Sequence, residues 1–331
     1  MNVLVAGGTG FVGTALCETL AARGHDVTAL ARDPTDAALL DDVAPVPGEA
    51  PTVGHTPGSV STVAGDVTDC DTIEDAFTGQ DAVVNLVALS PLFQPEGGGD
   101  AHDRVHRGGT ENCVRAARRH DVDRFVQLSA LGADPDGPTA YIRAKGRAEE
   151  IVRTSTLDWT IVRPSVVFGD GGEFVGFTRL LTTPYVTGLP GGGKTRFQPI
   201  WVGDLAPMLA ATVEDDAHVR ETYEIGGPAV LTLADVAREI YRSDGRWVRV
   251  LPVPMLLAGL GLAVAEYLPV IPMGRDQYRS LQFDNTTEDN DVDAFGVEPD
   301  ELRTFEAYLT GKITNHDAES SAGVPEGAVE G

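Results

Sequence analysis

The stretch NVLVAGGTGFVG, residues 2–13, joins a run of aliphatic residues to three glycines spaced three apart. A short apolar run followed by a glycine-rich turn predicts a buried strand that leads into a helix. In this pattern Gly7 permits a tight turn, Gly10 lets the backbone approach a pyrophosphate, and Gly13 allows close packing of the helix on the strand. The helix N-terminus would attract phosphate through its free N–H groups. The predicted dinucleotide site comprises Gly7, Thr9, Gly10, Phe11, Val12 and Gly13.

Short apolar runs alternate with helical patterns along the first half of the chain. After the opening run they lie at residues 26–32, 60–67, 81–89, 124–132 and 159–169. Nearly continuous apolar runs of this length are typical of parallel strands that are covered on both faces. We therefore predict an α/β fold, with a Rossmann-type doubly wound parallel sheet and a small C-terminal α/β lobe.

The chain divides into three parts on the same pattern. Residues 1–170 form the predicted nucleotide-binding core, interrupted by a loop rich in Pro, Gly and Asp at 33–59. Residues 171–313 are assigned mainly to the small lobe, with some elements returning to the core, and 233–242 has a helical pattern. The acidic tail at 314–331 lacks apolar periodicity and is predicted to be disordered.

Composition excludes several classes of partner and site. The 331 residues include 50 acidic and 25 basic ones, for a net charge of −25, so nucleic acid is not an expected partner. Three widely spaced cysteines suggest neither a disulfide framework nor a metal site. The few lysines, at positions 145, 194 and 312, and the acidic excess resemble proteins of salt-in halophiles; an ordinary acidic cytosolic protein is the alternative.

The most hydrophobic segment of the chain is residues 251–273. Four prolines and Glu266 leave an apolar stretch that is too short to span a bilayer. We expect a helix of the small lobe, with a docking face for a membrane or a respiratory complex as the alternative. No secretory signal precedes the first strand, so the expected location is the cytoplasm, with peripheral contact at the inner membrane face as an option.

The residues after the second and third predicted strands bear on the choice of cofactor. Arg32 stands where a carboxylate usually accepts the ribose hydroxyls of NAD. A guanidinium there can pair with a 2′-phosphate and favours NADP(H) over NAD(H), unless Arg32 is only a solvated surface residue. Asp66, followed by Val67, is placed to bind the adenine amino group, and a helix cap is its alternative role.

Ser129, Tyr141 and Lys145 form the candidate catalytic set. Tyr141 and Lys145 are four residues apart and share one helix face, so the ammonium could lower the pKa of the phenol while it contacts the nicotinamide ribose. Tyr141 would then transfer a proton near neutral pH. Ser129, at a strand end, could hydrogen-bond the substrate oxygen; the alternative is a surface tyrosine with an ion-paired lysine.

With these motifs the chain resembles the short-chain dehydrogenase/reductase superfamily, in its extended or atypical branch. The segments GGTGFVG, LSALGADPDGPTAYIRAKGRAEE, WTIVRPSVVFG and YEIGGPAVLTLADV are similar to the family that contains the accessory NADPH-binding subunit of respiratory complex I. The resemblance implies further contacts along the cofactor cleft from Leu86, Val87, Ala88, Arg163, Pro164 and Ser165.

One position departs from the pattern of extended dehydrogenases. They commonly carry an Asn in N-V-x-G-T, whereas this chain reads VHRGGT with His106 in that place. His106 is either a titratable substitute or a structural residue.

Three functions are compatible with these features. The leading one is an NAD(P)H-dependent oxidoreductase that acts on an unknown small substrate, with a quinone-related compound as one option. The second is a non-catalytic NADPH-binding subunit or assembly factor of a respiratory complex, and the third is a nucleotide-sugar epimerase or dehydratase. The sequence predicts neither the substrate nor the oligomeric state.

Overall fold

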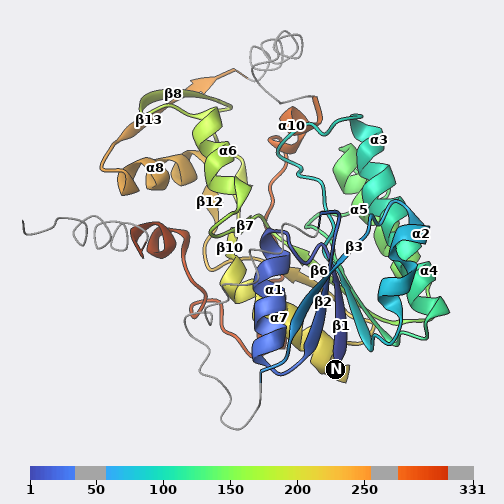
Figure 1. Ribbon diagram of the computed structural model, residues 1–331. Coiled ribbons are helices and arrows are strands. Elements are labelled where there is room, and N and C mark those ends of the chain that lie inside the picture. Colours follow the sequence, from blue (N-terminus) through green and yellow to red (C-terminus); the bar gives the residue numbers. More distant parts are fainter. Residues whose placement is uncertain (34–56, 255–274, 312–331) are drawn as a thin grey trace, which may run out of the picture.

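The computed structural model describes residues 1–33, 57–254 and 275–311, and within them a parallel sheet of seven strands forms the core (Figure 1). The strand order is β3-β2-β1-β4-β5-β6-β11. The strands are β1 (Asn2–Ala6), β2 (Asp26–Ala31), β3 (Val60–Ala64), β4 (Ala82–Asn85), β5 (Arg124–Leu128), β6 (Asp158–Pro164) and β11 (Thr222–Ile225). Every pair in this sheet is parallel, which confirms the predicted doubly wound α/β fold.

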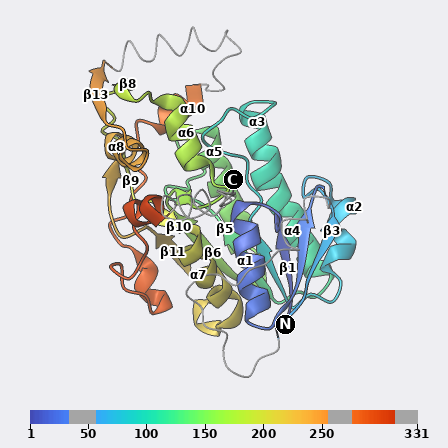
Figure 2. The ribbon, with the colours of Figure 1, turned by 60° about the vertical axis from the view of Figure 1, so that its left-hand side comes forward.

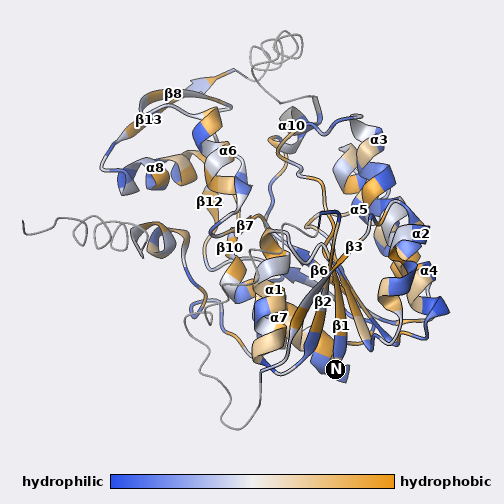
Figure 3. Ribbon diagram, in the orientation of Figure 1, coloured by the Kyte–Doolittle hydropathy of each residue, from blue (hydrophilic) through white to orange (hydrophobic). Residues whose placement is uncertain are grey.

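Helices cover both faces of the sheet because its strands are apolar on both sides. One face packs against α1 (Phe11–Ala22) and α7 (Val202–Glu214) through side chains such as Leu16 and Leu209. The other packs against α2 (Cys70–Ile73), α4 (Gly109–Arg119) and α5 (Ala140–Arg153). Figure 3 shows the sheet mostly in the hydrophobic colour between these two layers. Shorter turns precede α4, namely η2 (Glu74–Phe77), α3 (Gly99–His102) and the π-helix η3 (Asp103–Gly108).

The predicted strands run past the observed ones at their carboxyl ends. The run at 124–132, for example, ends as strand β5 at Leu128. The loop residues that follow, such as Leu86, Ala130 and Leu131, are also buried, so the apolar signal continues after the strand stops. An apolar run therefore predicts where these segments are buried, but it does not predict where strand pairing ends.

A smaller lobe follows β6 and lies beside the core (Figure 2). Its own apolar core includes Phe174, Leu189 and Phe305. The helix predicted at 233–242 is confirmed as α8, whose N-terminus is closed by a capping box of Thr232 and Asp235. The elements from β7 onward, apart from α7 and β11, are β7 (Val167–Phe168), α6 (Glu173–Leu181), β8 (Tyr185–Pro190), β9 (Arg196–Phe197), β10 (Ile200–Trp201), η4 (Asp216–His218), β12 (Leu231–Thr232), α8 (Leu233–Ser243), β13 (Val248–Val253), α10 (Arg275–Ser280) and η5 (Asp291–Phe295).

Part of the segment 251–273 was assigned wrongly. Leu251–Val253 do not begin a helix but form the end of β13, which pairs in parallel with β8. A partner strand satisfies the backbone there, which sequence periodicity does not reveal. Residues 255–274 lie outside the described residues, as do 34–56 and the tail from 312. Within the described residues, no helix has the length and apolarity needed to cross a membrane.

Candidate functional site

The sheet topology gathers the predicted site residues at one edge. Because all seven strands are parallel, their carboxyl ends lie together. Chain order reverses between β1 and β4, and ligands of such sheets bind in the crevice at this reversal. The segments at that edge start at Arg32, Gly65, Gly7, Leu86, Ser129 and Ser165.

The glycine loop has the geometry that its spacing predicts. Gly7 has φ +84°, which only glycine adopts without strain, and it begins the tight turn after β1. A Cβ on Gly13 would lie 2.1 Å from the carbonyl oxygen of Gly7, so α1 rests directly on the turn. At Gly10 a Cβ would meet only that same oxygen, at 3.2 Å, and it would project into the space in front of the loop.

The N-terminus of α1 fits a dinucleotide phosphate. The first helical hydrogen bond runs from the Thr14 amide to the Gly10 carbonyl, so the amides of Phe11, Val12 and Gly13 precede it. No side chain caps this end, and the first turn contains no acidic residue. An uncapped helix end without a repelling carboxylate is suited to an anion.

The adenosine end of the predicted site includes Arg32, Asp66 and Val67. Arg32 is exposed just after β2, near the point where the Gly7 amide donates to the Leu30 carbonyl. Asp66 does not cap α2, since Asp69 has that role. Asp66 instead accepts hydrogen bonds from the backbone and hydroxyl of Thr68, which orients its carboxylate at the end of β3.

Tyr141 and Lys145 lie on the first two turns of α5. The hydroxyl of Thr139 accepts from the Ile142 amide and so begins the helix just before Tyr141. Lys145 is buried, and its ammonium donates to the carbonyl of Leu128 at 2.9 Å. The Nζ atom lies 5.9 Å from the centre of the Tyr141 ring. The predicted helix-face pairing is thus present, and it is tied to the end of β5.

The predicted effect of Lys145 on the tyrosine is wrong for this structure. Burial raises the pKa of the Tyr141 phenol above its ordinary value. Burial also lowers the pKa of Lys145 to about 8, against a smaller opposing effect of the Glu149 carboxylate. Desolvation opposes both the phenolate and the ammonium, so the pKa of each group moves in the direction that favours its neutral form.

Ser129 does not have the free hydroxyl that its predicted role requires. Its Oγ donates to the buried carboxylate of Glu149 at 2.5 Å. Glu149 also accepts two hydrogen bonds from Arg163, at 2.9 and 2.7 Å, and pairs with Arg153 at 2.9 Å. Because the Ser129 proton is committed to Glu149, its oxygen faces any other group as an acceptor. In this state it does not donate to a substrate carbonyl.

The contacts implied by the family resemblance lie at the expected edge, but their polar groups have partners within the protein. Arg163 binds Glu149 and Glu224, and the Ser165 hydroxyl donates to Asn285. The Leu86 amide donates to the Ala6 carbonyl. Val87 contacts the glycine turn and donates its amide to Asn85, while Pro164 accepts from the Leu131 amide and Ala88 is exposed. Their contact with a cofactor stays a prediction.

Two features of the site were missed at the sequence level. Glu149 is four residues after Lys145 and eight after Tyr141, a spacing on one helix face that could have indicated it. His102 was not considered, yet it and His106 are both buried against Tyr141. Their clustering depends on the π-helix η3, which sequence periodicity does not predict.

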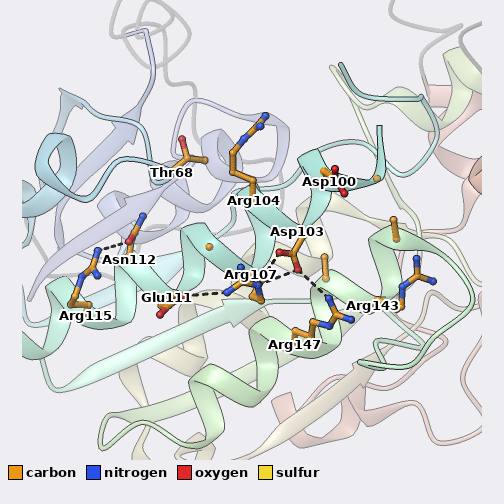
Figure 4. Close-up of a pocket in the computed structure, with 14 residues that line it drawn as sticks. Thr68, Asp100, Asp103, Arg104, Arg107, Glu111, Asn112, Arg115, Arg143 and Arg147 are labelled. Atoms are coloured by element: carbon orange, nitrogen blue, oxygen red, sulfur yellow. Dashed lines mark hydrogen bonds and ion pairs between the residues drawn. The ribbon is translucent and has the colours of Figure 1, made fainter. Parts of the chain in front are cut away.

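A hollow of about 620 Å³ lies on the outer side of α3, η3, α4 and α5 (Figure 4). Arginines line it, but Arg107 bonds Asp103 and Glu111, and Arg147 bonds Asp103. Its rim reaches Thr68, while the glycine loop and Tyr141 lie outside its lining. We therefore place the candidate site at the strand ends and assign no ligand to this hollow.

The fold and the edge together define a nucleotide-binding α/β protein. A profile of the family described as NAD(P)H-binding matches residues 7–178, just over half of the chain. The chain belongs to this NAD(P)H-binding family.

Curated relatives are similar to this chain over most of its length. It is 29% identical over 299 residues to subunit 9 of the mitochondrial NADH dehydrogenase (ubiquinone) 1 alpha subcomplex of Arabidopsis thaliana, covering 86% of this chain and 71% of that protein. It is 26% identical over 265 residues to the NAD(P)H azoreductase of Xenophilus azovorans, covering 78% and 82% of the two chains. The predicted similarity to the complex I subunit family is therefore confirmed.

Solved structures share the fold over nearly the whole chain. The dTDP-glucose 4,6-dehydratase DesIV of Streptomyces venezuelae, with NAD and TYD bound, has a TM-score of 0.70 at 20% identity, covering 97% of this chain and 98% of that one. The UDP-glucose 4-epimerase of Thermus thermophilus, with NAD, has a TM-score of 0.64 at 20% identity, covering 96% and 99%. At this identity the likeness establishes the fold.

Burial of Lys145 makes stability depend on pH. Because its pKa falls from 10.5 to about 8 on folding, the unfolded chain binds more protons between these values, and folding gains stability as pH rises through them. We expect Lys145→Met to be more stable than the wild type at pH 7. Its advantage should shrink between pH 8 and 10.5, by at most about 1.4 kcal/mol per pH unit.

Urea unfolding at several pH values measures this difference in unfolding free energy. Lys194→Met is the control, because it removes one lysine charge from an exposed position. An advantage of Lys145→Met that stays constant from pH 7 to 10.5 would contradict the assigned burial.

Proposed function

We propose that the chain is an NADPH-dependent oxidoreductase that acts on a small molecule with a reducible carbonyl or quinone group. The observation that carries this proposal is the placement of Tyr141 and Lys145 beside the same sheet edge as the glycine loop. Family membership supports the cofactor class. The names of the relatives, an azoreductase and a complex I subunit, are compatible with reduction of such acceptors.

The residues at this edge would have separate roles in cofactor binding and proton transfer. Phe11, Val12 and Gly13 would hold the pyrophosphate through their amides, and Lys145 would contact the nicotinamide ribose. NADPH supplies a hydride when bound. Tyr141 would donate its phenolic proton to the substrate oxygen as that oxygen becomes a hydroxyl. The raised phenol pKa keeps Tyr141 in the protonated form that a proton donor requires.

The surroundings of the loop after β4 support an apolar substrate. This loop reaches the small lobe, where Ser90 donates to Glu173 of α6. Next to that contact, Phe93 and Phe177 meet edge to face, with ring centres 5.5 Å apart. An aromatic pair thus lies where this loop meets the small lobe, and aromatic side chains favour a planar, apolar carbonyl compound such as a quinone.

The preference for NADPH over NADH rests on Arg32. Its exposed guanidinium follows β2 where the ribose of a bound dinucleotide would lie. A charge-assisted hydrogen bond to a 2′-phosphate would distinguish the two cofactors.

A second candidate function is a cofactor-holding subunit without turnover. The commitment of the Ser129 proton to Glu149 favours it, because the predicted substrate contact is then absent. An exposed apolar strip along β8 and β13, formed by Tyr185, Val186, Trp247 and Leu251, supports docking on a membrane or respiratory complex. Cosedimentation with lipid vesicles tests the docking: binding that survives Trp247→Ser would contradict a role for this strip.

Replacing Tyr141 with Phe tests the enzymatic proposal. The variant retains the ring but lacks the proton, so we expect NADPH consumption to fall about 100-fold or more. The Kd for NADPH should stay within about threefold of the wild type, because the phenol is not assigned to hold the phosphates. Consumption is followed at high salt with a quinone panel and a small-molecule extract of the source cells.

Tyr185→Phe, an exposed tyrosine on β8, is the matched control for the Tyr141 experiment. Turnover that is unchanged in Tyr141→Phe would reject the assigned role. If the wild type and Tyr141→Phe both bind NADPH and neither consumes it, the cofactor-holding function replaces the enzymatic one.

Replacing Arg32 with Gln tests the cofactor preference. Loss of one charge-assisted hydrogen bond should raise the Kd for NADPH about tenfold or more and leave the Kd for NADH within about threefold. Fluorescence titration of the reduced cofactors measures both constants. Arg238→Gln, an exposed arginine on α8, is the control. Equal weakening for the two cofactors would show that Arg32 does not contact a 2′-phosphate.

A further inference from the structure

Three aromatic rings form a buried cluster beside the candidate site. The His102 and His106 rings meet the Tyr141 ring edge to face, with centres 5.6 and 5.2 Å apart, and the two histidine rings are 5.4 Å apart. Both histidines are only 2% exposed. Tyr141 is therefore held on the side of η3 and α3 by two imidazoles.

His106 also binds the backbone of the loop after β4. The Leu89 amide donates to its Nε2 at 3.0 Å. A ring nitrogen that accepts from an amide has no proton, so the neutral ring carries its proton on Nδ1. That Nδ1 is buried and has no hydrogen-bond partner among the described residues. The contact with Leu89 thus determines the tautomer.

The surroundings of His106 keep it neutral. Burial lowers its pKa well below the ordinary value, and the charges of Lys145 and His102 act in the same direction. A neutral ring can accept from Leu89 at all times, whereas a protonated one would lose the hydrogen bond. The contact is consequently a permanent part of the fold rather than a switch.

The position of the loop gives this contact its significance. Leu89 directly follows Leu86–Ala88, the segment predicted to line the cofactor cleft. The π-helix η3 widens the turn that carries His106, and such turns recur at functional sites. One imidazole therefore touches both the cleft-lining loop and the ring of Tyr141.

We propose that His106 is a positioning residue: its neutral Nδ1–H form joins the Leu86–Leu89 loop to Tyr141 and sets their relative position. This inference rests on the proposed function only for its effect on cofactor and turnover. The tautomer and the contact with Leu89 are properties of the chain without ligand.

Two substitutions at His106 separate the acceptor from the ring. In His106→Gln the amide oxygen can replace Nε2 as acceptor, whereas His106→Phe keeps a ring against Tyr141 but leaves the Leu89 amide unpaired. The Leu89 contact is part-buried, and leaving its amide unpaired corresponds to about a tenfold effect. We expect His106→Phe to raise the Kd for NADPH or lower kcat/KM at least about tenfold, and His106→Gln to stay within about threefold of wild type.

His218→Phe is the matched control. His218 is also buried, and its Nδ1 lies 2.8 Å from the hydroxyl of Tyr223, which belongs to the apolar core on the α1 and α7 face. It should leave the Kd for NADPH within about twofold, so it reports the general effect of losing a buried histidine. Equal constants for wild type and His106→Phe, or a loss in His106→Gln as large as that in His106→Phe, would overturn the proposal.

A spectroscopic measurement tests the inference without cofactor and without a variant that must fold. Long-range ¹H–¹⁵N correlation of the imidazole nitrogens in the wild type should show His106 protonated on Nδ1 and unprotonated on Nε2 across about pH 5–8. A proton on Nε2, or titration at the ordinary histidine pKa, would overturn it. If the wild type binds neither NADPH nor NADH, the proposed function fails, and this spectrum still decides the role of His106.

Discussion

The buried carboxylate of Glu149 holds the candidate site together. It accepts hydrogen bonds from Ser129 at the end of β5 and from Arg163 on β6, and it pairs with Arg153 one turn further along α5. A buried carboxylate without such partners would cost several kcal/mol, so α5 is held where Ser129 and Arg163 can reach it. Because Tyr141 and Lys145 belong to the same helix, this network also sets their depth at the sheet edge.

Burial then determines the chemistry that these residues offer. Lys145 is surrounded by protein and is held by a single carbonyl, so its pKa falls, while that of Tyr141 rises. The two shifts favour the neutral amine and the neutral phenol, which makes Tyr141 a proton donor rather than a ready base. A protonated phenol is the form of Tyr141 that the proposed reduction of an acceptor requires.

The relatives of this chain have names that indicate different uses, from azo reduction to a place in complex I. In this chain the distinction depends on a few hydrogen bonds. The Ser129 hydroxyl donates to Glu149, which supports a protein that holds its cofactor without turnover. Tyr141 and Lys145 lie at the same edge of the sheet, which supports a protein that uses its cofactor in a reaction. Fold alone cannot separate these functions, because they differ in side-chain partners and not in topology.

The sequence alone determined the layout: apolar runs of strand length, the glycine spacing of Gly7, Gly10 and Gly13, and the Tyr141–Lys145 spacing are local patterns with a local physical cause. The tertiary structure decided the contacts between residues that are far apart in the sequence. Glu149 reaches Arg163 and Ser129 across two strands, His106 reaches Leu89 through a π-helix, and β13 pairs with β8 from a distant part of the chain. Sequence periodicity shows which face of a helix or strand is buried. Only the tertiary packing shows which buried groups are in contact, and the desolvation of those groups shifts their pKa values.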